Sequence, residues 1–204
     1  MHIGIDLDNT LVCYDHVIHD AAVARGLIPR DFPARKDLVR NELRSRGQEA
    51  EWTMLQGWIY GPGMQYATPF AGAVDVIRQW VADGHRVSLV SHKSRLPFAG
   101  PAYDLHDAAR RWLESHQLLG TRESRSLLDV HLELTKSAKL RRIAAIGCDG
   151  FIDDLPEILT DAEFPPGVSG LLFDPGRIHA EFPGPSFADW TSLSPAWLAE
   201  GAPQ

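Results

Sequence analysis

The sequence has few cysteines and no long apolar segment. Its only two cysteines, Cys13 and Cys148, stand far apart and match no metal-binding or redox spacing, which indicates free thiols in a reducing compartment. No apolar run approaches the roughly 20 residues that a membrane-spanning helix requires. These absences argue against a disulfide-stabilised secreted protein and against a membrane protein, so we expect a cytoplasmic location.

Positive charge is also scarce. The chain has 20 Lys and Arg residues against 27 Asp and Glu residues, a net charge of −7, and its basic residues form no cluster. This balance argues against a nucleic acid as partner. A small phosphorylated substrate remains compatible with this net negative charge, because a metal ion in the site would determine the local electrostatic potential. The oligomeric state cannot be read from these patterns.

The order of apolar patterns predicts an α/β fold. With 204 residues, 44% of them apolar, the chain fits one domain, or one core with a modest insertion. Helical spacing alternates with short strand-like runs, which implies a parallel sheet with right-handed crossovers. Thr135 is a plausible N-cap and Gly147 a plausible end for one helix. The expected helices cover residues 71–83, 103–116 and 136–146, and the expected strands cover 3–5, 86–90, 126–134, 150–153 and 170–174.

Two pairs of acidic residues follow strand-like runs. Asp6 and Asp8 come after residues 3–5, and Asp153 and Asp154 stand at the end of another short run. Strand alternation would send Asp6 and Asp8 the same way, and open α/β folds place ligands at the carboxyl edge of the sheet. Two like charges about 4 Å apart repel by roughly 4 kcal/mol at an effective dielectric near 20, so such a group needs a cation or a shared proton. Mg²⁺ takes oxygen ligands of this kind.

These acids belong to a longer pattern that resembles a known family. Asp6-x-Asp8-x-Thr10, then Ser91 after a strand, then a lysine, then Asp153-Asp154 match in order the four motifs of the haloacid dehalogenase-like superfamily. The resemblance runs from residue 6 to residue 154. It implies a Rossmann-like three-layer sandwich with a central parallel sheet. Because the first motif stands so near the start, we expect no signal peptide ahead of it.

Residues 14–68 do not read as strand–helix units. They contain helix-like segments at 14–25, 33–46 and 48–60, which matches the small helical cap that many members of this superfamily carry after the first motif. The expected domains are therefore a core of residues 1–13 and 69–204 and a cap of residues 14–68. Four aromatic residues of this segment either form its core or stack on a base or sugar ring: Trp52, Trp58, Tyr60 and Tyr66.

The resemblance implies roles for the first acidic pair. Asp6 would attack phosphorus and become an aspartyl phosphate, since a carboxylate is already ionised at neutral pH. Asp8 would protonate the leaving oxygen and then deprotonate the hydrolytic water. The main-chain carbonyl of Asp8 would also bind the metal. The dehalogenase branch lacks an acid at this position, so Asp8 favours phosphoryl transfer.

Other site residues follow from the same resemblance. Ser91 would hydrogen-bond a phosphoryl oxygen, although a serine after a strand is otherwise usually a helix N-cap. The catalytic lysine is either Lys136 or Lys139, and the spacing in similar sequences favours Lys139. The metal ligands would be Asp6, Asp8, Asp153 and Asp154, with Asp153 the more direct ligand of the second pair.

Further candidates for substrate binding are Thr10 and three residues that follow Ser91. His92, Lys93 and Arg95 would bind a second anionic group of the substrate, or they form a solvated loop.

Together the motifs predict a Mg²⁺-dependent phosphatase for a small metabolite, acting through an aspartyl phosphate. The alternatives are a phosphotransferase or mutase of the same superfamily, and a non-catalytic module that binds a phosphorylated ligand. A sugar phosphate and a nucleotide fit these patterns equally well as the substrate.

Overall fold

The computed structural model describes residues 1–120, 126–194 and 197, and the chain divides into two compact units. The first unit comprises Met1–Val12, Pro69–Lys93 and His116–Gln204, and the second comprises Cys13–Thr68 and Ser94–Ser115. The second unit thus contains the expected insertion together with a segment that sequence patterns placed in the core. Two short paired strands, β2 (Val12–Cys13) and β3 (Thr68–Pro69), lie at the two ends of the insertion.

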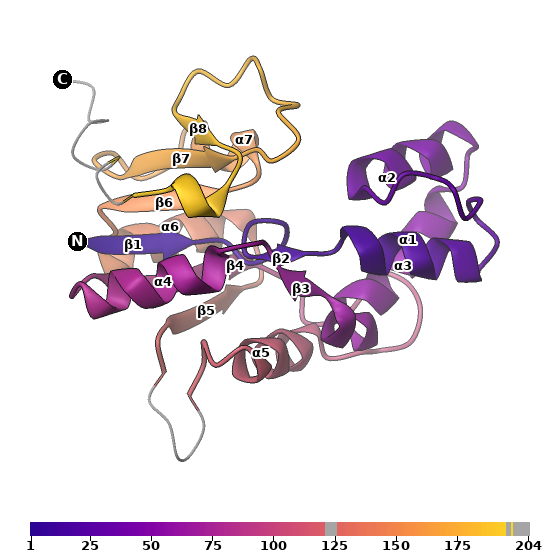
Figure 1. Cartoon of the computed structure of the whole chain (residues 1–204), viewed down its shortest axis with the longest axis horizontal. Coiled ribbons are helices and arrows are strands. Elements are labelled where there is room, and N and C mark those ends of the chain that lie inside the picture. The colour runs from indigo at the N-terminus through magenta and orange to yellow at the C-terminus, as the bar shows by residue number, and fades with distance from the viewer. Residues whose placement is uncertain (121–125, 195–196, 198–204) are drawn as a thin grey trace. The chain divides into compact units, whose positions relative to one another are not determined.

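The first unit is built on a sheet of six parallel strands in the order β5-β4-β1-β6-β7-β8 (Figure 1). The predicted α/β fold with a Rossmann-like parallel sheet is therefore confirmed. The last strand, β8, was not predicted, because two residues carry no readable pattern. The strands are β1 (His2–Ile5), β4 (Arg86–His92), β5 (Asp129–Glu133), β6 (Gly150–Asp153), β7 (Ser169–Phe173) and β8 (Ser186–Phe187).

Strand β1 lies at the centre of this sheet. It pairs with β4 on one edge and with β6 on the other, so that Ile5 lies opposite both Leu89 and Ile152. Its residues are buried, as expected for a strand covered on both faces. The main-chain N–H of Asp6 donates to the carbonyl of Ile152 at 2.9 Å, which continues the pairing one residue past the strand.

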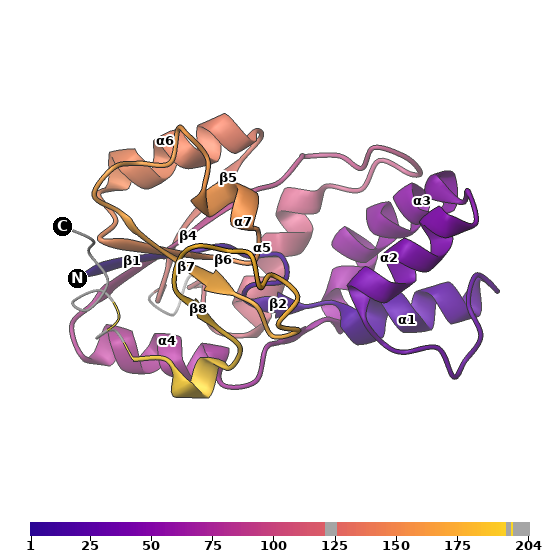
Figure 2. The same ribbon diagram turned by 90° about the horizontal axis from the view of Figure 1, so that it is seen from above.

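Helices cover both faces of the sheet (Figure 2). α6 (Lys136–Ile146) lies on one face and α4 (Ala73–Ala82) on the other. The Thr135 side chain accepts a hydrogen bond from the N–H of Ala138, and Gly147 ends α6 in the left-handed conformation, so both predicted caps of this helix are confirmed. Beneath α6 and α7 (Pro156–Leu159), a buried cluster contains Val90, Leu140, Ile143, Cys148, Phe151 and Ile158.

The last described segment packs on the edge of the sheet. The short 3₁₀ helix η2 (Trp190–Ser192) brings the buried Trp190 ring against Phe173, Phe187 and Trp80. The expected packing of the tail, residues 182–197, is confirmed at these positions, while residues 195–196 lie outside the described residues.

The second unit is helical. Trp52 and Trp112 are buried in it, and Nε1 of Trp112 donates to the carbonyl of Ala67 at 2.8 Å, which ties α5 to this unit. Trp58 stacks on the exposed Tyr66. No helix among the described residues is long and apolar enough to cross a membrane. The helices are α1 (Asp15–Ala24), α2 (Lys36–Ser45), α3 (Glu49–Tyr60), the 3₁₀ helix η1 (Pro62–Tyr66) and α5 (Leu105–Ser115).

The close packing of β1 against β6 gives a test of the core. A Cβ atom on Gly4 would lie 2.4 Å from Cδ2 of Phe151 and 2.9 Å from Sγ of Cys148. We expect Gly4→Ala to lower the free energy of unfolding by about 1–3 kcal/mol, the usual effect of overpacking. Urea denaturation measures it.

A matched control for Gly4→Ala is Gly170→Ala, in a neighbouring part of the same sheet. There the nearest atom to a new Cβ is the flexible Cδ2 of Leu159 at 3.3 Å, so the loss should stay below about 1 kcal/mol. Equal losses for the two variants would contradict the packing of Gly4 on Phe151.

Candidate active site

Three carboxylates gather at the carboxyl ends of β1 and β6. Asp6 follows β1 directly, Asp153 is the last residue of β6, and Asp154 comes next. One oxygen from each of them lies within 4.8 Å of the others. The parallel register of the two strands sets Asp6 and Asp153 side by side, as the ends of neighbouring parallel strands require.

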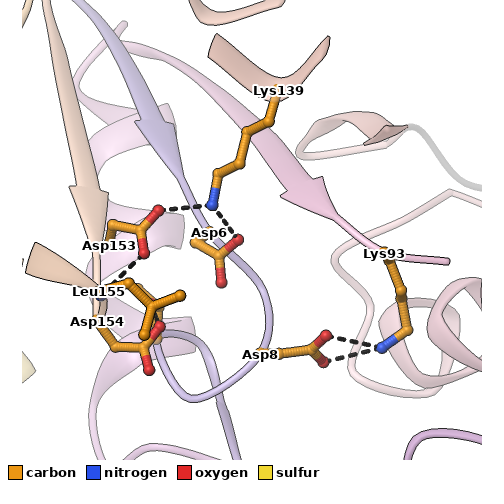
Figure 3. Close-up of polar contacts among 8 residues, drawn as sticks. Asp6, Asp8, Lys93, Lys139, Asp153, Asp154 and Leu155 are labelled. Atoms are coloured by element: carbon orange, nitrogen blue, oxygen red, sulfur yellow. Dashed lines mark hydrogen bonds and ion pairs between the residues drawn. The ribbon is translucent and has the colours of Figure 1, made fainter. Parts of the chain in front are cut away.

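Lys139, in the first turn of α6, lies between two of these acids (Figure 3). Its Nζ donates to Oδ1 of Asp6 at 2.6 Å and to Oδ2 of Asp153 at 2.5 Å, and the side chain is only 2% exposed. Burial acts to lower the pKa of Lys139, but the charges of Asp153 and Asp6 outweigh it and raise the pKa above the ordinary value of a lysine. The group therefore carries its positive charge at neutral pH.

The other candidate lysine, Lys136, has a different environment. It is exposed and forms an ion pair with Asp161. The geometry thus places Lys139 and not Lys136 beside the acids, in agreement with the preference drawn from similar sequences.

Asp6, Asp153 and Asp154 together carry more negative charge than the single ammonium group of Lys139 offsets. Burial raises the pKa of Asp153 to about 7, although the charge of Lys139 opposes the rise. The other oxygen of Asp153, Oδ1, accepts a hydrogen bond from the N–H of Leu155 at 3.0 Å, which fixes the side chain (Figure 3). A divalent cation fits this donor set, because carboxylate oxygens are the ligands that hard cations prefer and because its charge would balance the excess.

Asp8 does not join this group. Its two oxygens accept hydrogen bonds from Nζ of Lys93 at 3.0 and 2.8 Å, and Figure 3 shows its carboxylate turned toward that lysine. The expectation that the carboxylates of Asp6 and Asp8 meet is therefore wrong. Alternation along the strand ceases to apply because β1 ends at Ile5 and the loop turns at Asn9, whose φ is 65°.

Thr10 contacts one acid of the group directly, and Ser91 lies in the strand next to β1. Thr10 is fully buried, and its Oγ1 donates to Oδ1 of Asp154 at 3.4 Å. Its carbonyl accepts from Nε1 of Trp190 at 3.1 Å, a contact that no sequence pattern indicated. Ser91 is buried near the end of β4, the strand beside β1.

The three residues that follow Ser91 have separate environments. His92 is exposed, and partial burial of its ring together with the charge of Lys139 lowers its pKa. Lys93 is buried against Asp8, so it is not part of a solvated loop. Arg95 belongs to the second unit, where it forms an ion pair with Asp104 at 3.1 Å. They therefore do not form one anion-binding cluster within the first unit.

Comparison with known proteins identifies the fold. No protein-family model and no curated protein matches the sequence. Among solved structures, a β-phosphoglucomutase from Pyrococcus sp. strain ST 04 has a TM-score of 0.56 at 14% identity, covering 98% of this chain and 99% of that one. A dehalogenase has a TM-score of 0.54 at 12% identity, covering 99% and 97% of the two chains. A HAD-superfamily hydrolase from Ehrlichia chaffeensis has a TM-score of 0.51 at 14% identity, covering 93% and 92%.

The chain has the fold of haloacid dehalogenase-like hydrolases, as the order of its motifs predicted. At identities of 12–14% this similarity establishes the fold alone, and the reaction depends on the residues of the site.

The burial of Lys139 leads to a test of stability in metal-free buffer. Lys139→Met keeps most of the volume but leaves Asp6 and Asp153 buried without their ammonium group. We expect a loss of about 3–5 kcal/mol in the free energy of unfolding, the usual result of removing one partner of a buried ion pair.

The matched control is Lys136→Met, which removes an exposed ion pair and should leave the free energy of unfolding nearly unchanged. If the Lys139 variant were as stable as the Lys136 variant, the contacts of Lys139 with the two acids would not contribute as described.

Proposed function

We propose that this protein is a Mg²⁺-dependent phosphatase that removes phosphate from a small phosphorylated metabolite through an aspartyl-phosphate intermediate. The observation that carries the proposal is the group of Asp6, Asp153 and Asp154 with Lys139 bound between the first two. It lies at the carboxyl edge of a parallel sheet, the edge where α/β folds bind ligands. The similarity in fold to hydrolases and to a β-phosphoglucomutase supports phosphoryl chemistry.

The metal would be held by the side chains of Asp6, Asp153 and Asp154 and by the main-chain carbonyl of Asp8. When bound, Mg²⁺ supplies positive charge that shields the phosphoryl oxygens from the attacking carboxylate. The hydrogen bond from Thr10 to Asp154 helps to fix one of these carboxylates.

The side chains of the site have different roles in the reaction. A carboxylate oxygen of Asp6 bonds to phosphorus as the bond to the leaving oxygen breaks, and Asp8 gives that oxygen a proton. Water then attacks the phosphoryl group on Asp6, gives a proton to Asp8, and phosphate is released. Lys139 orients Asp6 and, with Ser91, binds phosphoryl oxygens, while Thr10 and His92 are candidates for contacts with the substrate.

Phosphotransfer to a sugar would share the first half of this reaction. The presence of Asp8 favours phosphoryl chemistry over dehalogenation, but the same residues serve hydrolysis and transfer. Measuring free phosphate against phosphorylated acceptor separates the two. We also propose that residues 14–68 act as a substrate-selecting cap, which screening phosphorylated metabolites with cap variants would test.

Replacement of Asp6 tests the proposed nucleophile. Asp6→Asn removes the attacking oxygen with little change in volume, so phosphate release from 4-nitrophenyl phosphate should fall by about a thousandfold or more. Asp129→Asn, at an exposed ion pair with Arg86, should keep full activity and shows that mutation and purification are harmless. Turnover of a folded Asp6→Asn variant within tenfold of the wild-type rate would exclude the aspartyl-phosphate route.

Metal binding should be measurable without catalysis. Saturating Mg²⁺ should raise the melting temperature by several degrees, because it binds the folded state and relieves repulsion among the three acids. The rise should disappear in Asp153→Asn and persist in Asp129→Asn. An equal rise in melting temperature in both variants would mean that Mg²⁺ stabilises the protein by binding at a different site.

A further inference from the structure

Besides the contacts of Lys139, the first unit contains a part-buried ion pair between Lys93 and Asp8 (Figure 3). Lys93 follows β4 and Asp8 follows β1, and these strands are neighbours in the sheet. The lysine side chain is 3% exposed and the aspartate side chain 19%. Nζ contacts both carboxylate oxygens, at 3.0 and 2.8 Å, so the lysine restrains the orientation of the whole carboxylate.

The backbone of Lys93 is held as well. Its N–H donates to the carbonyl of Glu133, the last residue of β5, at 2.8 Å. An ammonium group at so buried a position requires a negative partner, and Asp8 provides one. The same contact keeps the carboxylate of Asp8 out of the group formed by Asp6, Asp153 and Asp154.

We propose that Lys93 is the positioning residue of Asp8, an inference that rests on the proposed phosphatase function. In this role Lys93 acts on the reaction through Asp8 and does not bind the substrate. The proposal replaces the sequence interpretation in which Lys93 binds a second anionic group. Lys139 serves the acid that attacks phosphorus, and Lys93 serves the acid that transfers protons.

The proton transfer balances without any further reactant. The Asp8 carboxyl group gives its proton to the leaving oxygen as the Asp6–phosphorus bond forms, and Asp8 becomes a carboxylate. It recovers a proton from the water that hydrolyses the phosphoryl group on Asp6, while Lys93 keeps its own protons throughout. Between these two steps Asp8 is ionised, and in this form it can accept both hydrogen bonds from Nζ of Lys93.

Two substrates of similar size but different leaving groups test the proposal. 4-Nitrophenolate leaves without protonation, whereas the alkoxide of benzyl phosphate needs a proton. The ratio kcat/KM reports steps up to the departure of the leaving group, provided that departure is irreversible. Lys93→Met should therefore lower kcat/KM by about 100-fold for benzyl phosphate and by less than about fivefold for 4-nitrophenyl phosphate. Asp8→Asn should show the same selective loss.

The double variant identifies the route by which Lys93 acts. If Lys93 acts through Asp8, adding Lys93→Met to Asp8→Asn should leave kcat/KM unchanged within about threefold for both substrates. A further loss in the double variant, or an equal loss on both substrates in Lys93→Met, would overturn the proposal and favour direct substrate binding by Lys93. A wild-type protein that releases phosphate from neither substrate would instead refute the proposed function.

Stability supplies a readout that does not need catalysis. In metal-free buffer the double variant should melt at a higher temperature than Lys93→Met alone, because it also removes the part-buried carboxylate that has lost the ammonium group of Lys93. A lower melting temperature for the double variant would contradict the pairing. If Lys93→Met fails to fold, the comparison of Asp8→Asn with the double variant still decides the proposal.

Discussion

Lys139 and the two acids beside it, Asp6 and Asp153, form the contact on which the rest of the site depends. The register of β1 and β6 brings two carboxylates together in a buried place, where their repulsion opposes folding. The ammonium group offsets that repulsion, but only if α6 starts at the right residue. The cap at Thr135 defines that start and sets Lys139 in the first turn, facing the sheet. A local feature of one helix thus determines whether charges on two strands can coexist.

The same constraint explains why the acids fall into two groups. Three carboxylates lie close together with one lysine that contacts two of them, and they retain excess negative charge, an arrangement suited to a cation. The fourth, Asp8, has a lysine of its own and is therefore balanced without metal. In the proposed mechanism this difference in pairing corresponds to a difference in task, since a carboxylate that binds metal is poorly placed to exchange protons.

Much of this arrangement could be predicted from the sequence where the signals are local. The span of α6 followed from Thr135 and Gly147, and the acids after two short apolar runs indicated strand ends that meet. The ordered motifs indicated the fold. The direction of the Asp8 side chain could not be predicted, because strand alternation applies only while the strand continues. Its pairing with Lys93 joins residues far apart in the chain, which no periodic pattern records.

For a similar reason, the sequence could not predict that α5 belongs to the second unit. Its apolar spacing shows that one face is buried but not which surface covers that face. The hydrogen bond from Trp112 to Ala67 and the contacts of α5 with η1 answer that question in favour of the second unit.

The central place of β1 has a consequence for how the chain folds. The strand that precedes Asp6 is synthesised well before its two neighbours in the sheet, which begin at Arg86 and Gly150. Its hydrogen bonds on both edges are non-local contacts, and these form slowly because long segments of chain must first be closed. During synthesis β1 is therefore an apolar strand without partners, a state prone to aggregation. The acidic site is completed only when β6 emerges, so the metal ion of the proposed function could not guide the early stages of folding.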